Sequence, residues 1–176
     1  MKMTDRCNFT QKFTGYLFTV VAFGITLMAV ARASELQVTL PLVEHGTSTY
    51  YTLATIEGTA ECPFMVDTGA GYTTINKAML KDLQKQDLVE YKRSITGVMA
   101  DGSKNIVKIY LVKKMTLGRN CSFLDVEVAV LPGNSRAILG MSLLKRATSF
   151  TINPRSASLS VVCNGTGNLA LLGPDI

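Results

Sequence analysis

The sequence predicts a mainly β domain preceded by a separate N-terminal segment. From residue 34 onward, apolar and polar side chains alternate with a period of two in several short stretches, as in half-buried strands. Glycine, proline, asparagine and aspartate separate these stretches, and only two others have the spacing of a helix. The 176 residues leave room for one domain, and a content of 47% hydrophobic and 18% charged residues excludes a wholly disordered chain.

The expected strands are bounded by turn residues. Residues 51–55 and 60–66 are joined through Glu57-Gly58-Thr59, which is typical of a β-hairpin. Pro132-Gly133 ends a later strand, and Asn153-Pro154-Arg155 is expected to form the turn of a last hairpin. The expected strands cover residues 36–40, 51–55, 60–66, 106–115, 123–131, 150–152 and 159–162.

Two short helices are expected. Residues 76–86 begin with Asn76, a favourable N-cap, and place Met79, Leu80 and Leu83 on one face. Residues 141–147 form the second helix, and Lys145-Arg146 is expected to be its solvated end rather than a reader of substrate. The tail from residue 164 to 176 is rich in glycine and asparagine and then in leucine, so we expect it to be poorly fixed.

The first 33 residues have the pattern of a targeting segment. Lys2, Arg6 and Lys12 precede an apolar run over residues 13–30, and Ala31-Arg32-Ala33 follows it. This pattern predicts a signal peptide cleaved after Ala33. An uncleaved anchor is the alternative, because 18 helical residues span roughly 27 Å and could hold the protein at the inner membrane. Either interpretation predicts a periplasmic or otherwise extracytoplasmic domain, since the basic flank stays inside.

Charge and cysteine usage exclude several functions. The chain carries 18 basic and 13 acidic side chains, but residues 34–176 hold 14 and 12, so a nucleic-acid partner is not expected. A single histidine and the lack of a C-x-x-C motif give no support for a metal site, and no cofactor is implied. Cys7 lies in the targeting segment. Cys62, Cys121 and Cys163 leave open either one disulfide with a free thiol or no disulfide.

Three stretches carry the chemical information. The apolar residues 64–66 lead into Asp67-Thr68-Gly69-Ala70, so a carboxylate follows a buried strand. Alone, this triplet is also compatible with an ordinary turn at a strand end. Some 70 residues later, Ala137-Ile138-Leu139-Gly140 is a second apolar run that enters a short helix. Between them, residues 95–103 form a hairpin with Gly97 and Gly102 at its shoulders, and Asp101-Gly102 is expected to be a turn pair.

In this combination the chain resembles the retropepsin-like aspartic peptidases, and most closely their bacterial, secreted or membrane-anchored single-domain members. The resemblance covers residues 49–163, so residues 34–48 would be an N-terminal extension with a strand, and 164–176 a C-terminal tail. It implies a closed, barrel-like β fold with a flap. It also implies one catalytic aspartate per chain and a homodimer with its active site on the two-fold axis.

The resemblance assigns a role to each residue of these stretches. Asp67 would be the catalytic carboxylate. Paired with its copy in the partner, it would share one proton and activate a water for attack on the peptide bond. Thr68 would hydrogen-bond across the dimer, while Gly69 and Ala70 complete the loop. Ile138, Leu139 and Gly140 would pass behind the loop and support it. The flap residues that would cover an extended peptide substrate are Gly97, Val98, Met99 and Ala100.

Two points qualify the resemblance. Retroviral members carry acidic residues just after the Asp-Thr-Gly-Ala motif, where this chain has Gly71 and Tyr72, so peptide anchoring must differ. A retropepsin-like domain could also serve as a non-catalytic binding or scaffold module of the cell envelope. The intact Asp67-Thr68-Gly69 triplet favours the enzyme, because a binding module has no need of the carboxylate.

Overall fold

The computed structural model describes residues 35–46 and 48–164. Residues 1–31 and 32–176 separate into two units, and the described residues all belong to the second unit. The expectations for residues 1–33 and for the tail beyond residue 164 therefore lie outside the described residues. None of the helices in the described ranges is long and apolar enough to cross a membrane.

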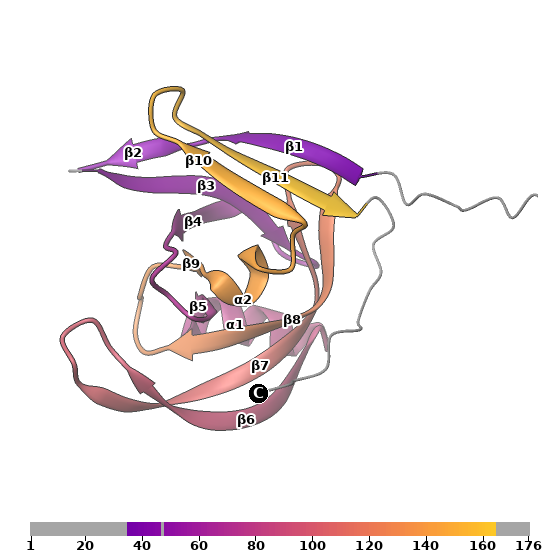
Figure 1. Ribbon diagram of the computed structural model, residues 1–176. Helices are drawn as coiled ribbons and strands as arrows, with labels where there is room; N and C mark the ends of the chain where they lie inside the picture. Colours follow the sequence, from indigo (N-terminus) through magenta and orange to yellow (C-terminus); the bar gives the residue numbers. More distant parts are fainter. Residues whose placement is uncertain (1–34, 47, 165–176) are drawn as a thin grey trace, which may run out of the picture. The chain divides into compact units, whose positions relative to one another are not determined.

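The described part of the chain is mainly β, as the sequence predicts (Figure 1). The elements are, in chain order, β1 (Glu35–Pro41), β2 (Val43–His45), β3 (Thr49–Ile56), β4 (Cys62–Val66), β5 (Thr73–Asn76), α1 (Lys77–Lys85), β6 (Val89–Val98), β7 (Lys104–Leu117), β8 (Cys121–Leu131), β9 (Ile138–Leu139), α2 (Met141–Leu144), β10 (Ser149–Asn153) and β11 (Ser158–Asn164).

The larger sheet has eight strands in the order β2-β3-β4-β9-β5-β8-β7-β6. A further pairing between β3 and β7 closes the sheet into a barrel, in which residues 54–56 lie opposite residues 115–117. The expected closed barrel is therefore confirmed. The pairs β4–β9 and β5–β8 are parallel, and the other pairs are antiparallel. The hairpin of β6 and β7 extends beyond this closed part (Figure 1).

Alternation along the strands fills the barrel with apolar side chains. In β3, Thr52, Ala54 and Ile56 are buried, whereas Leu53 is 46% exposed on the opposite face. The helix α1 adds Leu83 to the core, and Asn76 caps this helix by accepting a hydrogen bond from the backbone N–H of Met79. The largest fully buried side chains are Phe64, Ile56, Ile75, Leu83, Ile109, Met115, Leu117, Leu139, Leu143, Leu144, Leu159 and Val112.

Some elements differ from the sequence-based expectation. The structure adds β2, β5 and β9, and β6 begins at Val89 rather than near residue 95. Residues 73–75 of β5 are buried without alternation, because this strand is parallel to β8 inside the sheet. Most of β6 is exposed on both faces, so its sequence has no period of two. These strands lack the alternating pattern on which the prediction depended.

The end of the second helix was predicted incorrectly. The helix α2 ends at Leu144, and Arg146 is half-buried rather than solvated. Its guanidinium donates hydrogen bonds to the carbonyls of Leu124 (2.6 Å) and Asp125 (3.1 Å). Burial lowers the pKa of Arg146, although the Asp125 charge opposes this shift. Arg146 therefore attaches the residues after α2 to β8, while Lys145 is exposed as expected.

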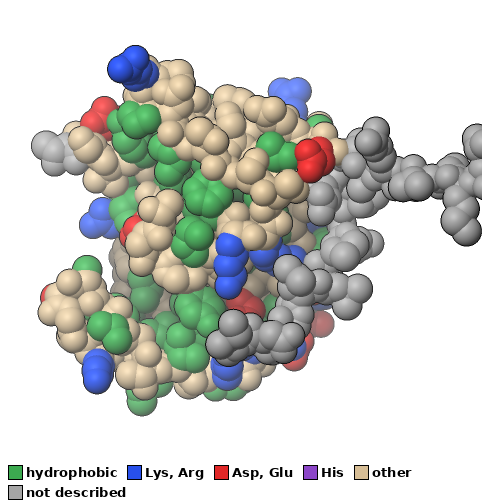
Figure 2. Space-filling model, viewed as in Figure 1, with side chains coloured by type: hydrophobic (Ala, Val, Ile, Leu, Met, Phe, Trp, Pro, Cys, Tyr) green, Lys and Arg blue, Asp and Glu red, His purple; other side chains and the backbone are tan. Residues whose placement is uncertain are grey.

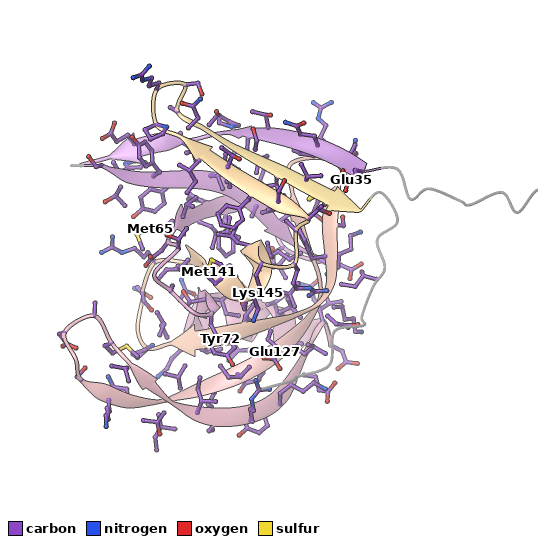
Figure 3. The ribbon with its side chains drawn as sticks, viewed as in Figure 1. Glu35, Met65, Tyr72, Glu127, Met141 and Lys145 are labelled. Atoms are coloured by element: carbon purple, nitrogen blue, oxygen red, sulfur yellow. A yellow bond between two sulfur atoms is a disulfide. The ribbon has the colours of Figure 1, made fainter. Side chains whose placement is uncertain are left out.

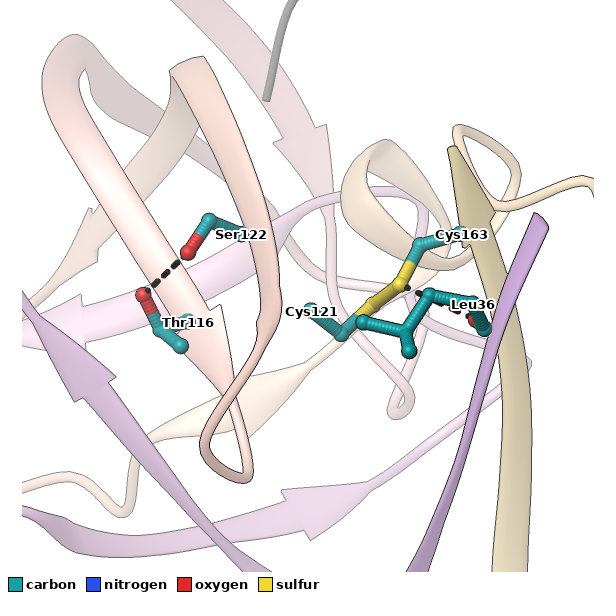
Figure 4. The surroundings of a disulfide bond; sticks show 5 residues. All are labelled: Leu36, Thr116, Cys121, Ser122 and Cys163. Atoms are coloured by element: carbon teal, nitrogen blue, oxygen red, sulfur yellow. Dashed lines mark hydrogen bonds between the residues drawn. A yellow bond between two sulfur atoms is a disulfide. The ribbon is translucent and has the colours of Figure 1, made fainter. Parts of the chain in front are cut away.

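A smaller sheet with the order β1-β11-β10 joins the two ends of the described chain. Cys121 at the start of β8 and Cys163 near the end of β11 form a disulfide, and Cys62 is a free thiol. Figure 4 shows this bond beside Leu36, whose carbonyl lies 3.4 Å from the Cys163 sulfur. Of the arrangements that the sequence left open, the structure therefore has one disulfide and one free thiol.

We expect this disulfide to contribute substantially to stability. Replacing Cys121 and Cys163 together by serine should lower the free energy of unfolding by about 2–5 kcal/mol, because the unfolded chain loses a cross-link. The two cysteines lie 42 residues apart in the sequence, so the disulfide closes a long loop of the chain. Urea denaturation of the oxidised proteins measures the effect, with Cys62→Ser as the matched control. Equal midpoints for the double variant and the control would contradict this prediction.

Candidate active site

The candidate catalytic loop begins where β4 ends. The N–H of Met65 donates to the carbonyl of Ala137 (2.9 Å), and the N–H of Asp67 donates to that of Leu139 (3.2 Å), so the parallel pairing with β9 continues into the loop. The chain then turns. The N–H of Gly69 donates to Asp67 Oδ1 (2.8 Å), and the N–H of Ala70 donates to the Asp67 carbonyl (3.3 Å). The bond from Gly69 orients one oxygen of the Asp67 carboxylate, and this side chain is partly exposed.

The segment 138–140 supports this loop from behind. It passes between β4 and β5, and the N–H of Met141 donates to the carbonyl of Ala70 (2.8 Å). A Cβ atom on Gly140 would lie 2.8 Å from that same carbonyl oxygen and 2.6 Å from the carbonyl carbon of Tyr72. The structure therefore brings the two predicted motif segments together, and their contact requires a glycine at residue 140.

Buried polar groups complete the support. The N–H of Gly140 donates to the hydroxyl oxygen of Thr73 (3.2 Å), and the N–H of Thr73 donates to the hydroxyl oxygen of Ser142 (2.8 Å). Ser142 in turn donates to the carbonyl of Glu127 in β8 (3.1 Å). This chain of hydrogen bonds connects the loop, α2 and β8, and sequence reasoning did not identify Thr73 or Ser142. Their hydroxyls have no distinctive spacing that could have revealed them.

Thr68 and Gly69 are exposed at the tip of the catalytic loop. The side chain of Thr68 is therefore accessible at the surface. The described residues contain no group of three or more His, Cys, Asp or Glu side chains that could hold a metal ion. The candidate catalytic loop presents one carboxylate, that of Asp67, which is partly exposed.

The predicted flap is the β6–β7 hairpin. Its turn is held by hydrogen bonds from the N–H of Met99 to the Ser103 carbonyl (2.8 Å) and from the N–H of Gly102 to the Met99 carbonyl (2.9 Å). Gly102 has a φ of +80°, which a turn tolerates most easily with glycine. Hydrogen bonds from the Ser103 side chain and backbone lower the pKa of Asp101, so this acid acts as a turn residue.

The two faces of the hairpin differ. Ile95 and Met99 pack against a small cluster formed by Val107, Ile109 and Ala129, which Tyr72 also contacts. The pairing register places Val98 on the opposite face, where it is 66% exposed. Ala100 is also exposed, in the turn. Of the predicted flap residues, Gly97 and Met99 therefore face the same side as this cluster, and the role of all four in covering a peptide stays a prediction.

A charged group that sequence reasoning missed lies beside the catalytic loop. Arg93 of β6 makes two hydrogen bonds to the Glu127 carboxylate (2.6 and 2.7 Å), and it donates a third to the Tyr72 hydroxyl (3.2 Å). The bonds to Glu127 and Tyr72 raise the pKa of Arg93. Figure 3 shows Tyr72 and Glu127 close together below Met141. This group joins the flap hairpin, β8 and Tyr72, which follows the Asp67-Thr68-Gly69-Ala70 motif by two residues.

The space-filling view shows the surface around the β6–β7 hairpin. The β6–β7 hairpin projects from the surface at the lower left, and the surface between it and the strands above is hollowed (Figure 2). Met65, which precedes Asp67 by two residues, lies on the side toward which the hairpin reaches (Figure 3).

Comparison with known proteins agrees with this geometry. Residues 52–146, more than half of the chain, match the model of the family described as "gag-polyprotein putative aspartyl protease". The crystal structure of a retropepsin-like aspartic protease from Rickettsia conorii is similar in fold, with a TM-score of 0.52 and 21% sequence identity. That similarity covers 74% of this chain and 92% of the Rickettsia chain. No curated protein matches this sequence.

Proposed function

Because this chain belongs to the gag-polyprotein aspartyl protease family and is an aspartic-type peptidase, we propose that it acts as a homodimeric endopeptidase whose two Asp67 carboxylates form one catalytic pair. The single observation that carries the proposal is the catalytic loop. It presents one oriented carboxylate, and its Thr68-Gly69 tip is exposed where a second copy would meet it.

The chemistry requires two carboxylates. Brought close together, they share one proton, because two like charges at short distance disfavour full ionisation. The ionised carboxylate takes a proton from a bound water, and the protonated one donates to the carbonyl oxygen of the scissile bond. Water attacks directly, and no covalent enzyme intermediate forms. One chain supplies one such aspartate, so the second must come from another copy.

The substrate is proposed to bind as an extended peptide between the catalytic loop and the flap hairpin. An extended chain satisfies its backbone N–H and C=O groups by strand-like hydrogen bonds. Met99 and Gly97 would face the peptide from the hairpin, and closure of the hairpin would exclude water from the reaction.

Mixing wild-type protein with an inactive partner tests the shared site. After subunit exchange at equal amounts, Asp67→Asn protein should lower the activity of a constant amount of wild-type protein to about half, because mixed dimers carry only one carboxylate. Activity at low concentration should also fall more steeply than linearly on dilution, as dimers dissociate. Unchanged wild-type activity in fully exchanged mixtures, which native mass spectrometry can verify, would contradict the shared site.

We further propose that the catalytic domain works outside the cytoplasm. The basic start, the apolar run over residues 13–30 and Ala31-Arg32-Ala33 support this location, and the Cys121–Cys163 disulfide is typical of an oxidising compartment.

A reporter that is active only outside the cytoplasm, fused after Ile176, is expected to give a signal. A signal only from a cytoplasm-specific reporter would overturn this location. Mass spectrometry of the mature N-terminus then separates the two forms of the proposal. Ser34 at the N-terminus indicates a cleaved signal peptide, whereas Met1 or Lys2 indicates an anchor.

A further inference from the structure

One face of the barrel wall carries the catalytic carboxylate and its neighbours. In β4, Phe64 points into the core and is fully buried, so Met65 and the following Asp67 point to the opposite face. Tyr51 of β3 lies directly opposite Met65, and Ile138 of β9 lies beside it on the other side. Met65, Tyr51 and Ile138 are all partly exposed, so they form an accessible, mostly apolar floor next to the carboxylate.

Arg136 lies against this floor. It comes from the segment between β8 and β9, and its Nη1 is 3.4 Å from the Tyr51 hydroxyl and 3.6 Å from the Met65 sulfur. The Arg136 side chain is exposed, and no Asp or Glu of the described residues lies within ion-pair distance of it. Arg93 differs, because Glu127 neutralises it. Arg136 therefore keeps N–H donors and a positive charge available beside the catalytic loop.

We propose that Arg136 and the Tyr51 hydroxyl form a subsite for an acidic side chain, Asp or Glu, of the peptide substrate. This inference rests on the proposed peptidase function. Two residues along an extended strand span about 7 Å, so the floor around Met65 lies within one or two substrate residues of the Asp67 carboxylate. The acidic side chain would therefore belong to a residue at or next to the scissile bond.

The chemistry of this subsite favours a carboxylate over other groups. A guanidinium donates two parallel hydrogen bonds to a carboxylate, and the Tyr51 hydroxyl supplies another donor. The apolar side chains of Met65 and Ile138 reduce the local dielectric constant and strengthen the attraction. A substrate lysine or arginine would meet the charge of Arg136 and be disfavoured.

Matched peptides test the subsite. In a set built on one extended peptide that binds the protein, each central position carries Glu, Gln or Lys in turn. At one of these positions the wild-type protein should cleave the Glu peptide about tenfold better in kcat/KM than the Gln peptide, with the Lys peptide poorest. Arg136→Gln should remove this preference, and Arg136→Glu should reverse it toward Lys. Arg119→Gln has the same charge change in the β7–β8 turn, away from the floor, and should keep the wild-type preference.

A binding measurement separates this inference from the proposed function. Full-length Asp67→Asn protein, with and without Arg136→Gln, is titrated with fluorescently labelled Glu and Gln peptides of the same set. Tighter binding of the Glu peptide that depends on Arg136 supports the subsite, even if the wild-type protein cleaves none of the peptides and the peptidase proposal fails. The subsite would be overturned if the Glu and Gln peptides had equal kcat/KM values and equal dissociation constants. It would also be overturned if Arg136→Gln kept the preference for the Glu peptide.

Discussion

Replacement of Asp67 by asparagine is expected to abolish peptide cleavage and to leave the fold intact. The amide has nearly the same shape as the carboxylate, and its oxygen can still accept the hydrogen bond from the N–H of Gly69. It can neither ionise to activate a water nor relay a proton, so both steps of the proposed mechanism are lost. The measurement is the cleavage rate of a peptide library, beside circular dichroism and the melting temperature of the same preparation.

A conservative substitution of another acid tests whether the loss of cleavage is specific to Asp67. Asp101→Asn removes another carboxylate, in the turn of the flap hairpin, where the acid only accepts a hydrogen bond from Ser103. We expect this variant to retain cleavage that Asp67→Asn has lost. Cleavage by pure Asp67→Asn protein at a rate close to that of the wild type would exclude the aspartic mechanism for this chain.

Replacement of Gly140 by alanine is the second large effect that we expect. The new Cβ would meet the backbone of Ala70 and Tyr72, and backbone atoms of a supported loop cannot move aside as the end of a flexible side chain can. We expect the free energy of unfolding to fall by about 3 kcal/mol, and the catalytic loop to be displaced. Urea denaturation measures the first effect, and kcat/KM of the folded fraction measures the second.

Gly71→Ala is the matched control for this prediction. Gly71 lies in the same loop, but a Cβ at this position meets no atom within 4 Å and its φ is not in the left-handed region. The free energy of unfolding of the Gly71→Ala variant should therefore stay within about 0.5 kcal/mol of the wild type. If Gly140→Ala were as stable as Gly71→Ala, the close packing of segment 138–140 behind the catalytic loop would be contradicted.

The residues after the Asp67-Thr68-Gly69-Ala70 motif depart from the pattern that the resemblance to the retropepsin-like peptidases implies. Tyr72 stands where the resemblance places an acid, and its hydroxyl accepts a hydrogen bond from Arg93, which also binds Glu127. A carboxylate therefore remains in this region, but it comes from β8 rather than from the loop. Arg93 engages this carboxylate through two hydrogen bonds, whereas Arg136 has no Asp or Glu of the described residues within ion-pair distance.

Much of the fold could be predicted from the sequence alone, as could the loop that presents the Asp67 carboxylate. The period of two identified the strands that have one buried and one exposed face, such as β3 and β8. Asn76 marked the start of α1 because a side chain that caps a helix acts within three residues of its own position. Asp67-Thr68-Gly69 and Ile138-Leu139-Gly140 stood out because both motifs are contiguous in the chain.

Only the tertiary structure decided the contacts between distant residues. In the structure, Cys121 and Cys163 form the disulfide. Arg146 donates a hydrogen bond to a carbonyl of β8 instead of extending into solvent, and Arg136 lies beside Tyr51. It also showed β5, whose buried residues do not alternate, and β9, which is only two residues long. The physical reason is the same in each case. Periodicity, caps and turns reflect forces between residues close in the chain, whereas these pairings depend on how the closed barrel brings its strands together.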